Sequence, residues 1–493
     1  MKELLVQLDA DRKIPLYEQI CRFLKEEIRR GKIPPGEKLP SARALAAQLS
    51  VSRSTVDLAY GQLTSEGYLN SVPCRGYFVG DVSELYRLEH LEREPVHKRQ
   101  ADAPAFRYDF ALNGIDEESF PINIWRKISR EVLLEENSAL FQLGDPEGEW
   151  SLRTVIAEYL HHARGVNCRP EQIVMGAGND YLVILLSLLL GRDTRIAMEN
   201  PTYRSAWNCF RSLGHSVAAV PLDEAGMDVE RLEESGASAA YVMPSHQFPM
   251  GTVMPIRRRL QLLQWAAGRE GRFLIEDDYD SEFRYRGKPI PALQGYDTHD
   301  CVIYLGTFSK AIAPGIRVSY MVLPERLLPV YRERASVFSA TISRIDQSVL
   351  EIFLREGHFE RHLNRMRAVY KAKHDLLVKN LRELSGILEV SGEHAGVHLL
   401  VHFRNGITEQ EAIARAASAG IRVYGLSEYI IGEMPERGRN TVLLGYGPLR
   451  MQEIEEACRT LKQAWSALDS EAQRQKGAAP AALTREGPAR SSR

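Results

Sequence analysis

The segment 307–317 holds a lysine whose neighbours could bind a phosphorylated aldehyde. Thr307 and Ser309 precede Lys310, and Arg317 follows seven positions after the lysine. A lysine amine forms a Schiff base with an aldehyde, and hydroxyl and guanidinium groups fit a phosphate. Because a lysine beside a serine is usually only a surface residue, this segment needs support from elsewhere in the chain.

Polar residues also follow the apolar run 273–275. Asp277 stands where a strand is expected to end, and its carboxylate could pair with a protonated pyridine nitrogen. The phenol of Tyr279 could hydrogen-bond a ring hydroxyl. Such a cluster could equally bind a metal, but Lys310 follows Asp277 by 33 residues, and this spacing favours the first interpretation. We therefore predict no metal site.

Two more elements fit the same ligand. Residues 175–179 join an expected strand to a helix, and the N–H groups of Ala177 and Gly178 at the helix start suit a phosphate. Tyr203 offers an aromatic ring that could stack on a planar cofactor. A glycine-rich turn alone is more often just a turn, but the order and spacing of the four elements together predict a pyridoxal phosphate site.

A different chemistry is indicated near the N-terminus. Three hydroxyls and a guanidinium gather at the expected start of a helix: Ser52, Arg53, Ser54 and Thr55. Such groups at a recognition helix can meet base edges and phosphates, and Arg43 and Arg75 could bind the DNA backbone. Each arginine alone could be an ordinary solvated side chain. Residues 1–80 contain 12 Lys and Arg against 9 Asp and Glu, so the basic surplus lies here although the whole chain carries −2.

The elements around these residues predict a winged helix-turn-helix. A single apolar stripe marks the first helix: Leu16, Ile20, Leu24 and Ile28. Ser41 and Ser52 are suitable N-caps for a second and a third helix. Residues 68–72 and 76–80 flank a short turn and form the expected wing.

The rest of the chain predicts an α/β domain. Helical patterns alternate with short apolar runs at 195–198, 239–243, 273–276 and 301–305. We expect a DNA-binding domain at 1–80, a linker at 81–106, the large domain at 107–468 and a disordered tail at 469–493. The six scattered cysteines and the lack of a signal segment predict a cytoplasmic protein, and no stretch is long enough for a membrane span.

Both parts resemble known families. Residues 12–79, with the pattern LPSxRxLAxxLxVSRxTVxxAYxxLxxEGYL, resemble the GntR winged-helix regulators, and 107–468 resemble a fold-type I aminotransferase with large and small subdomains. Residues 241–251 and 275–285 are similar to the MocR (GabR-like) subfamily of GntR regulators. The resemblance implies an α+β winged helix-turn-helix followed by an α/β domain that binds pyridoxal 5'-phosphate as an internal aldimine of Lys310.

The resemblance also assigns roles around that lysine. Asp277 would pair with the pyridine nitrogen, Tyr279 would hold the ring hydroxyl, Tyr203 would stack on the ring, and Gln247 would lie near the ring hydroxyl. The phosphate would contact backbone or side chains of Ala177, Gly178, Thr307, Ser309 and Arg317.

One position departs from the family pattern. Many free aminotransferases carry an arginine on a late strand that binds the substrate α-carboxylate, and Leu443 occupies the matching slot. Arg204 and Arg439 are alternative carboxylate-binding residues, although both could be solvated. The effector could be an amine, an amino acid or pyridoxal phosphate itself; γ-aminobutyrate, taurine and D-alanine are effectors in the subfamily.

Three functions fit the sequence. The first is a transcriptional regulator whose effector displaces Lys310 and changes binding to a double-stranded DNA operator, with at most slow transamination. The second is a working class I/II aminotransferase that carries a DNA-binding domain, and the third is a DNA-binding protein with an inert dimerisation domain. The resemblance implies a homodimer in which each DNA-binding domain, or head, is swapped onto the large domain of the partner. A linker of ~26 residues, which spans up to about 85 Å when extended, would allow this arrangement.

Overall fold

The computed structural model describes residues 8, 14–81, 106–134, 138–285, 290–404, 406–434 and 436–477, with side chains except at 436–437 and 469–477. The chain forms two compact units, Met1–Ala103 and Pro104–Arg493. Most of the expected linker lies outside the described residues. We describe each unit by itself.

The first unit is a three-helix bundle with a β-hairpin. Its elements are α1 (Leu16–Arg29), α2 (Ala42–Leu49), α3 (Arg53–Ser65), β1 (Leu69–Val72) and β2 (Gly76–Val79). The side chain of Ser41 accepts a hydrogen bond from the Ala44 amide, and that of Ser52 accepts one from the Thr55 amide. These caps satisfy amides that the first helical turn leaves unpaired. The architecture predicted for this part of the chain is confirmed.

The apolar stripe of the first helix forms the centre of this unit. Ile20, Leu24 and Ile28 are buried, and they pack with Val56 and Tyr60 of α3. The unit therefore has its own hydrophobic core.

The second unit contains a mixed eight-stranded sheet in the order β4-β11-β10-β9-β8-β5-β6-β7. Its strands are β4 (Ile173–Gly176), β5 (Ile196–Asn200), β6 (Val217–Asp223), β7 (Gly226–Met227), β8 (Ala239–Val242), β9 (Phe273–Asp278), β10 (Val302–Thr307) and β11 (Ser319–Val322). β8, β9 and β10 run parallel, so their carboxyl ends meet at one edge. β11 is antiparallel to both neighbours.

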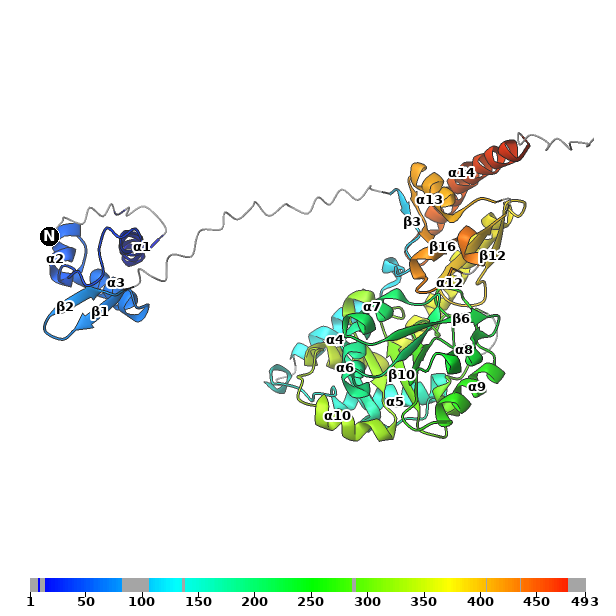
Figure 1. Cartoon of the computed structure of the whole chain (residues 1–493), viewed down its shortest axis with the longest axis horizontal. Coiled ribbons are helices and arrows are strands. Elements are labelled where there is room, and N and C mark those ends of the chain that lie inside the picture. The colour runs from blue at the N-terminus through cyan, green and yellow to red at the C-terminus, as the bar shows by residue number, and fades with distance from the viewer. Residues whose placement is uncertain are drawn as a thin grey trace, which may run out of the picture. The chain divides into compact units, whose positions relative to one another are not determined.

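Helices cover both faces of this sheet (Figure 1). One face packs against α6 (Asn179–Leu190), α7 (Arg204–Ser212) and α10 (Leu328–Arg334). The other packs against α5 (Trp150–Arg164), α8 (Val229–Glu234), α9 (Ile256–Ala267) and α11 (Arg344–Arg355), with α4 (Ile122–Leu134) against α11. Layers on both faces bury the apolar strands and confirm the predicted α/β class.

A smaller subdomain follows, built on the four-stranded sheet β12-β13-β16-β15. Its elements are α12 (His358–Arg382), β12 (Leu388–Ser391), β13 (His398–Phe403), α13 (Glu409–Ser418), β14 (Ile421–Arg422), β15 (Tyr424–Gly425), β16 (Thr441–Gly445) and α14 (Met451–Gly477). The early strand β3 (Tyr108–Asp109) pairs with β14. The start of the unit is thus attached to its C-terminal subdomain.

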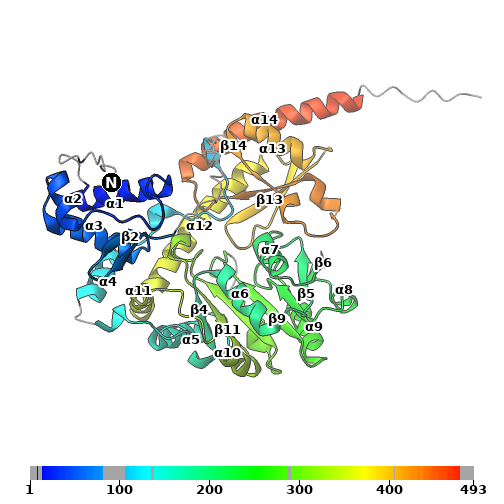
Figure 2. The same ribbon diagram turned by 60° about the vertical axis from the view of Figure 1, so that its left-hand side comes forward.

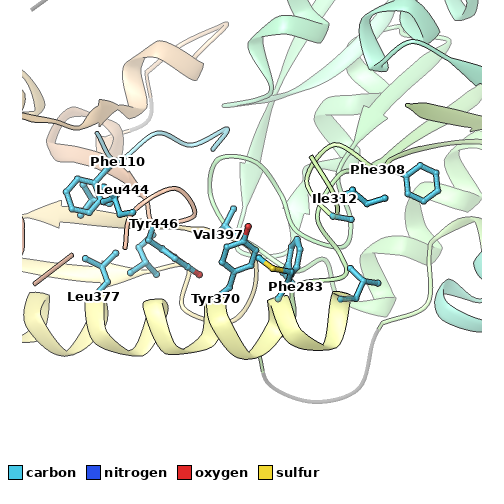
Figure 3. Packing of buried hydrophobic residues seen from close by; sticks show 14 of the residues in the cluster. Phe110, Phe283, Phe308, Ile312, Tyr370, Leu377, Val397, Leu444 and Tyr446 are labelled. Atoms are coloured by element: carbon cyan, nitrogen blue, oxygen red, sulfur yellow. The ribbon is translucent and has the colours of Figure 1, made fainter. Parts of the chain in front are cut away.

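The long helix α12 connects the two subdomains (Figure 2). Phe283 from the large subdomain and Tyr446 from the small one belong to the same buried cluster along this helix (Figure 3). Tyr370 and Leu377 are the helix's own contributions to the cluster. The shared core explains why the subdomains form one compact unit.

The C-terminal helix is longer than the sequence suggested. We expected a disordered tail from residue 469, whereas α14 continues to Gly477. The added residues are rich in Ala, Glu, Gln, Arg and Lys, which favour helix. Residues 478–493 lie outside the described part of the chain. Among the described residues, no helix is both long and apolar enough to cross a membrane.

Candidate cofactor and DNA-binding sites

A cavity of about 220 Å³ lies at the carboxyl edge of the large sheet, beside the small subdomain. Its wall combines residues from both subdomains: Leu112, Asn113, Asn179, Asp180, Tyr203, Met243, Phe248, Asp277, Tyr279, Asp280, Thr307, Ser309, Lys310, Pro314, Arg317, Val397 and His398. Seven of the ten residues predicted from sequence to contact a cofactor are among them. The parallel strands β9 and β10 end side by side here, and this explains how Asp277 and Lys310 reach one cavity.

Lys310 follows the end of β10 and lines the cavity. Its Nζ donates to the carbonyl oxygen of Leu112 at 2.5 Å. Burial lowers the pKa of the amine from 10.5 to about 8, although the charge of Asp280 opposes this change. A lysine with such a pKa has a substantial neutral fraction near neutral pH, which a nucleophilic amine requires.

Asp277 stands at the end of β9 and is only 3% exposed. Tyr241 donates its phenol hydrogen to one carboxylate oxygen, and Asn179 donates to the other at 3.3 Å. Burial raises the pKa of Asp277 to about 6, against the effect of the Tyr241 hydrogen bond. Since the charged form is costly in this environment, the site would be stabilised by a cation.

Hydroxyls and a guanidinium gather on another side of the cavity. Thr307 accepts hydrogen bonds from the Ser309 amide at 3.1 Å and from the Ser319 hydroxyl at 2.9 Å. Arg317 is half-exposed and pairs with Asp180 at 3.2 Å. These donors could be directed toward an anion, as the sequence predicted.

The turn at Gly178, just before α6, packs closely against the side chain of Arg317. Gly178 has φ +93°, and a Cβ atom there would overlap the Arg317 guanidinium. The Ala177 amide donates to the Thr341 hydroxyl, and the Gly178 amide donates to the Gly176 carbonyl. In this structure both amides already have partners, and Asn179 and Asp180 line the cavity instead. The predicted phosphate contacts of Ala177 and Gly178 remain predictions.

The two predicted aromatic contacts lie in the cavity wall. Tyr203 caps the start of α7, and its ring packs edge-on against Phe248 with centroids 6.2 Å apart. Tyr279 places its hydroxyl 3.0 Å from Nδ1 of His246. Burial raises the pKa of both phenols, so both remain protonated.

Gln247 does not reach the cavity wall. Its amide nitrogen donates to the carboxyl group of Glu199 and to the carbonyl oxygens of Pro201 and Phe248. It therefore joins the loop after β8 to the end of β5, and the next residue, Phe248, lines the cavity. The predicted contact between Gln247 and a ring hydroxyl remains a prediction.

The candidate effector residues lie outside the cavity wall. Arg204 is exposed, and its guanidinium donates to the carbonyls of Glu428 and Ile430. Arg439 is exposed in a 3₁₀ turn (Glu436–Asn440). Leu443 is fully buried in β16 and packs in an apolar cluster that includes Leu112.

Several cavity residues were missed by sequence reasoning. Asp280 lies inside the segment 275–285 and Phe248 inside the segment 241–251, so these segments could have indicated them. Leu112, Asn113 and His398 had no such signal because they come from distant parts of the chain.

In the first unit, the predicted DNA-binding residues occupy exposed or half-exposed positions. Ser52 caps α3 and its hydroxyl lies 2.8 Å from that of Ser54 and 2.7 Å from that of Thr55. Arg53 forms an exposed ion pair with Asp57 at 3.3 Å. Such pairs contribute at most about 1 kcal/mol, so DNA could replace this partner. Arg43 lies on α2 and Arg75 in the turn of the hairpin, both exposed.

The cavity residues fit pyridoxal phosphate. This cofactor requires a lysine amine, a carboxylate for its ring nitrogen and hydrogen-bond donors for its phosphate. The cavity provides a lysine with a lowered pKa and a buried carboxylate whose described hydrogen-bond donors are neutral. It also provides hydroxyl and guanidinium groups that can bind a phosphate. The buried Oδ1 of Asn179 also has no hydrogen-bond partner among the described residues. The donor set supports this cofactor over a metal ion, because it includes an amine and a guanidinium.

Comparison with known families agrees with both units. Residues 16–79 match the family described as "Bacterial regulatory proteins, gntR family", and 111–460 match "Aminotransferase class I and II". The second match covers more than half of the chain.

Relatives of similar length share both parts. The HTH-type transcriptional regulator YdeL of Bacillus subtilis is 39% identical over 92% of this chain and 97% of its own. The probable rhizopine catabolism regulatory protein MocR of Rhizobium meliloti is 31% identical over 94% and 96%. Among solved structures, the α-aminoadipate aminotransferase LysN of Thermus thermophilus, complexed with N-(5'-phosphopyridoxyl)-L-leucine, is 27% identical over 75% of this chain and 94% of its own, with a TM-score of 0.65.

Proposed function

The chain belongs to the MocR subfamily of GntR transcriptional regulators, and from this membership we propose that it binds pyridoxal phosphate at Lys310 and senses a small amine, an amino acid or the cofactor itself. Its DNA-binding head would read a double-stranded operator in the cytoplasm. The observation that carries the proposal is the cavity that joins Lys310, Asp277 and the hydroxyls of Thr307 and Ser309.

Bound pyridoxal phosphate would supply an aldehyde that reacts reversibly with amines. The chain's own residues would select and hold it. Lys310 provides a partly neutral amine, and Asp277 provides a buried negative charge for the ring nitrogen. Ser309, Thr307 and Arg317 would hold the phosphate by hydrogen bonds and charge.

A hydrogen bond of Lys310 also connects the cavity to the segment that follows the linker. Its amine donates to the carbonyl of Leu112, six residues after the start of the described part of this unit. Just before Leu112, Phe110 is tied to the small subdomain, since its amide donates to Arg422 and its carbonyl accepts from Gly445. Capture of the amine would remove the donor to Leu112. We infer that this change is transmitted along the segment toward the DNA-binding head.

A homodimer is supported by exposed apolar side chains on the large subdomain. Phe141 is 78% exposed, Leu143 87% and Val337 76%. Arg344, at the start of α11, donates to the carbonyl of Ala139, so the segment that carries Phe141 and Leu143 lies beside the start of α11. Exposed apolar side chains of this kind favour association with a second copy, and twofold symmetry would present two heads to paired half-sites.

One set of measurements on the full-length protein loaded with pyridoxal phosphate distinguishes a regulator from a working aminotransferase and from an inert domain. Candidate amines are added with a 2-oxo acid, while visible absorbance, product and binding to operator fragments enriched from random duplex DNA are followed. A regulator changes its absorbance and its operator binding without rapid turnover. Turnover above about 1 s⁻¹ with unchanged DNA binding would indicate a working aminotransferase. Absence of visible absorbance would indicate an inert domain.

A further inference from the structure

Beside the cavity, the buried side chains of His246 and Asp280 form a connected cluster with the partly buried Tyr279. Nδ1 of His246 lies 2.9 Å and 3.1 Å from the two carboxylate oxygens of Asp280, and 3.0 Å from the hydroxyl of Tyr279. The side chains of His246 and Asp280 are each 1% exposed. Tyr279 and Asp280 line the cavity, whereas His246 stands behind them.

The cluster is closed by the small subdomain. Gly396 has φ +75°, and a Cβ atom there would overlap Cε1 of His246 and lie 2.8 Å from Oδ2 of Asp280. The Gly396 carbonyl accepts hydrogen bonds from Tyr285 at 2.6 Å and from Tyr446 at 2.7 Å. The backbone at Gly396 is thus held against the imidazole, and only glycine leaves room for this approach.

The contacts of His246 define which ring nitrogen carries hydrogen. Nδ1 faces a carboxylate, which only accepts hydrogen bonds, so Nδ1 is the protonated nitrogen. The buried Nε2 has no hydrogen-bond partner among the described residues. A single N–H is therefore shared between Asp280 and the phenol oxygen of Tyr279. The phenol of Tyr279 also interacts with Asp280. When His246 donates to both Asp280 and the phenol oxygen, the phenol hydrogen can be donated into the cavity instead of to Asp280.

We propose that His246 is a positioning residue that directs the phenol hydrogen of Tyr279 into the cavity. This inference rests on the proposed function, in which Tyr279 donates to the ring oxygen of pyridoxal phosphate. A phenol that accepts a hydrogen bond is a stronger donor, because hydrogen bonds in a chain polarise one another. His246 would therefore strengthen the contact between Tyr279 and the cofactor without touching the cofactor itself.

Titratable groups face this cluster from several elements. They are Asp277, Asp278 and Asp280 at and after the end of β9, Lys310 after β10, and His398 on β13. Burial and the neighbouring carboxylates raise the pKa of Tyr279, so the phenol keeps its hydrogen. Burial lowers the pKa of His398 to about 3 and keeps it neutral. Neither of these two side chains titrates near neutral pH, so they do not account for a spectral transition there.

The test is a pH titration of the visible absorbance of the cofactor-loaded protein and of the His246→Phe variant. A weaker Tyr279 donor leaves more negative charge on the ring oxygen, and this charge holds the adjacent cofactor proton more tightly. We expect the spectral midpoint to move to higher pH by about one unit. The His246→Asn variant, whose amide can still donate, should restore part of the shift.

Two further variants separate positioning from general damage. His215 is another buried histidine of the large subdomain, bonded to Ser187 and Thr194 and absent from the cavity wall, so His215→Phe should leave the midpoint unchanged. Gly396→Ala displaces the imidazole without removing a titratable group and should shift the midpoint in the same direction as His246→Phe. If His246→Phe does not fold, the spectral midpoints of His246→Asn and Gly396→Ala still test the role of His246.

An unchanged midpoint in these variants would overturn the role of His246, and so would an equal shift in His215→Phe. Both results leave the proposed function intact, because the cofactor is still bound. Absence of a visible band in the wild-type protein would instead refute the proposed function and this inference together.

Discussion

Replacing Asp277 by asparagine tests the charge on which cofactor binding depends. The substitution keeps the shape of the side chain but removes its negative charge. Asp277 is 3% exposed, and its hydrogen-bond donors Tyr241 and Asn179 are neutral. In the Asp277→Asn variant, a protonated ring nitrogen would therefore meet a neutral amide where the wild-type protein presents a carboxylate.

The magnitude follows from the cost of leaving a buried charge without its partner. Breaking such a pair costs about 3 to 5 kcal/mol. Since about 1.4 kcal/mol corresponds to a tenfold change, 3 kcal/mol predicts at least about a hundredfold increase in the Kd for pyridoxal phosphate. Tyr241→Phe keeps the charge and removes only one donor, so we expect about tenfold or less.

The assay is a titration of the cofactor-free proteins with pyridoxal phosphate, followed by absorbance, with thermal unfolding as a control for the fold. The pKa of Asp277, raised to about 6, adds a second signature. Wild-type affinity should fall as the pH drops below about 6, because the protonated carboxyl no longer attracts a cation. Asp277→Asn should lack this dependence. An unchanged Kd in Asp277→Asn would refute the proposed pairing.

Four other substitutions test separate parts of the molecule. Lys310→Ala should lose the visible band while keeping the fold, and a cofactor still trapped by borohydride in this variant would show that another residue is the attachment site. Arg53→Ala should weaken operator binding, and Arg43→Ala should also lower the salt slope by about one unit if it meets a phosphate; wild-type binding by both variants would mean that α3 is not the reading helix. Glu199 is fully buried, and burial raises its pKa from 4.5 to about 8. The folded state therefore retains a proton that the unfolded chain loses, so wild-type stability should fall as the pH rises from about 4.5 to 8. Glu199→Gln should flatten this decline and be more stable at pH 8 by on the order of 1 kcal/mol or more; an equal loss of stability between about pH 6 and pH 8 in urea unfolding of both proteins would contradict it.

Local sequence patterns were sufficient for the two-part architecture and for several cavity residues. Ser41 and Ser52 cap helices as predicted, because an N-cap depends only on amides two or three residues away. Asp277 and Lys310 were identifiable because each follows an apolar strand, and parallel strands end at the same edge of a sheet. The chemistry of such residues is determined by side-chain type and by position relative to the nearest element.

The tertiary structure alone decided which distant groups complete the site. Leu112 reaches Lys310 and Gly396 reaches His246 only because α12 and the shared core hold the two subdomains together. Gln247 lies in a motif that resembles a cofactor site, yet its amide is used to join two loops. Such contacts depend on packing between segments far apart in the chain, and periodicity within one element carries no information about them.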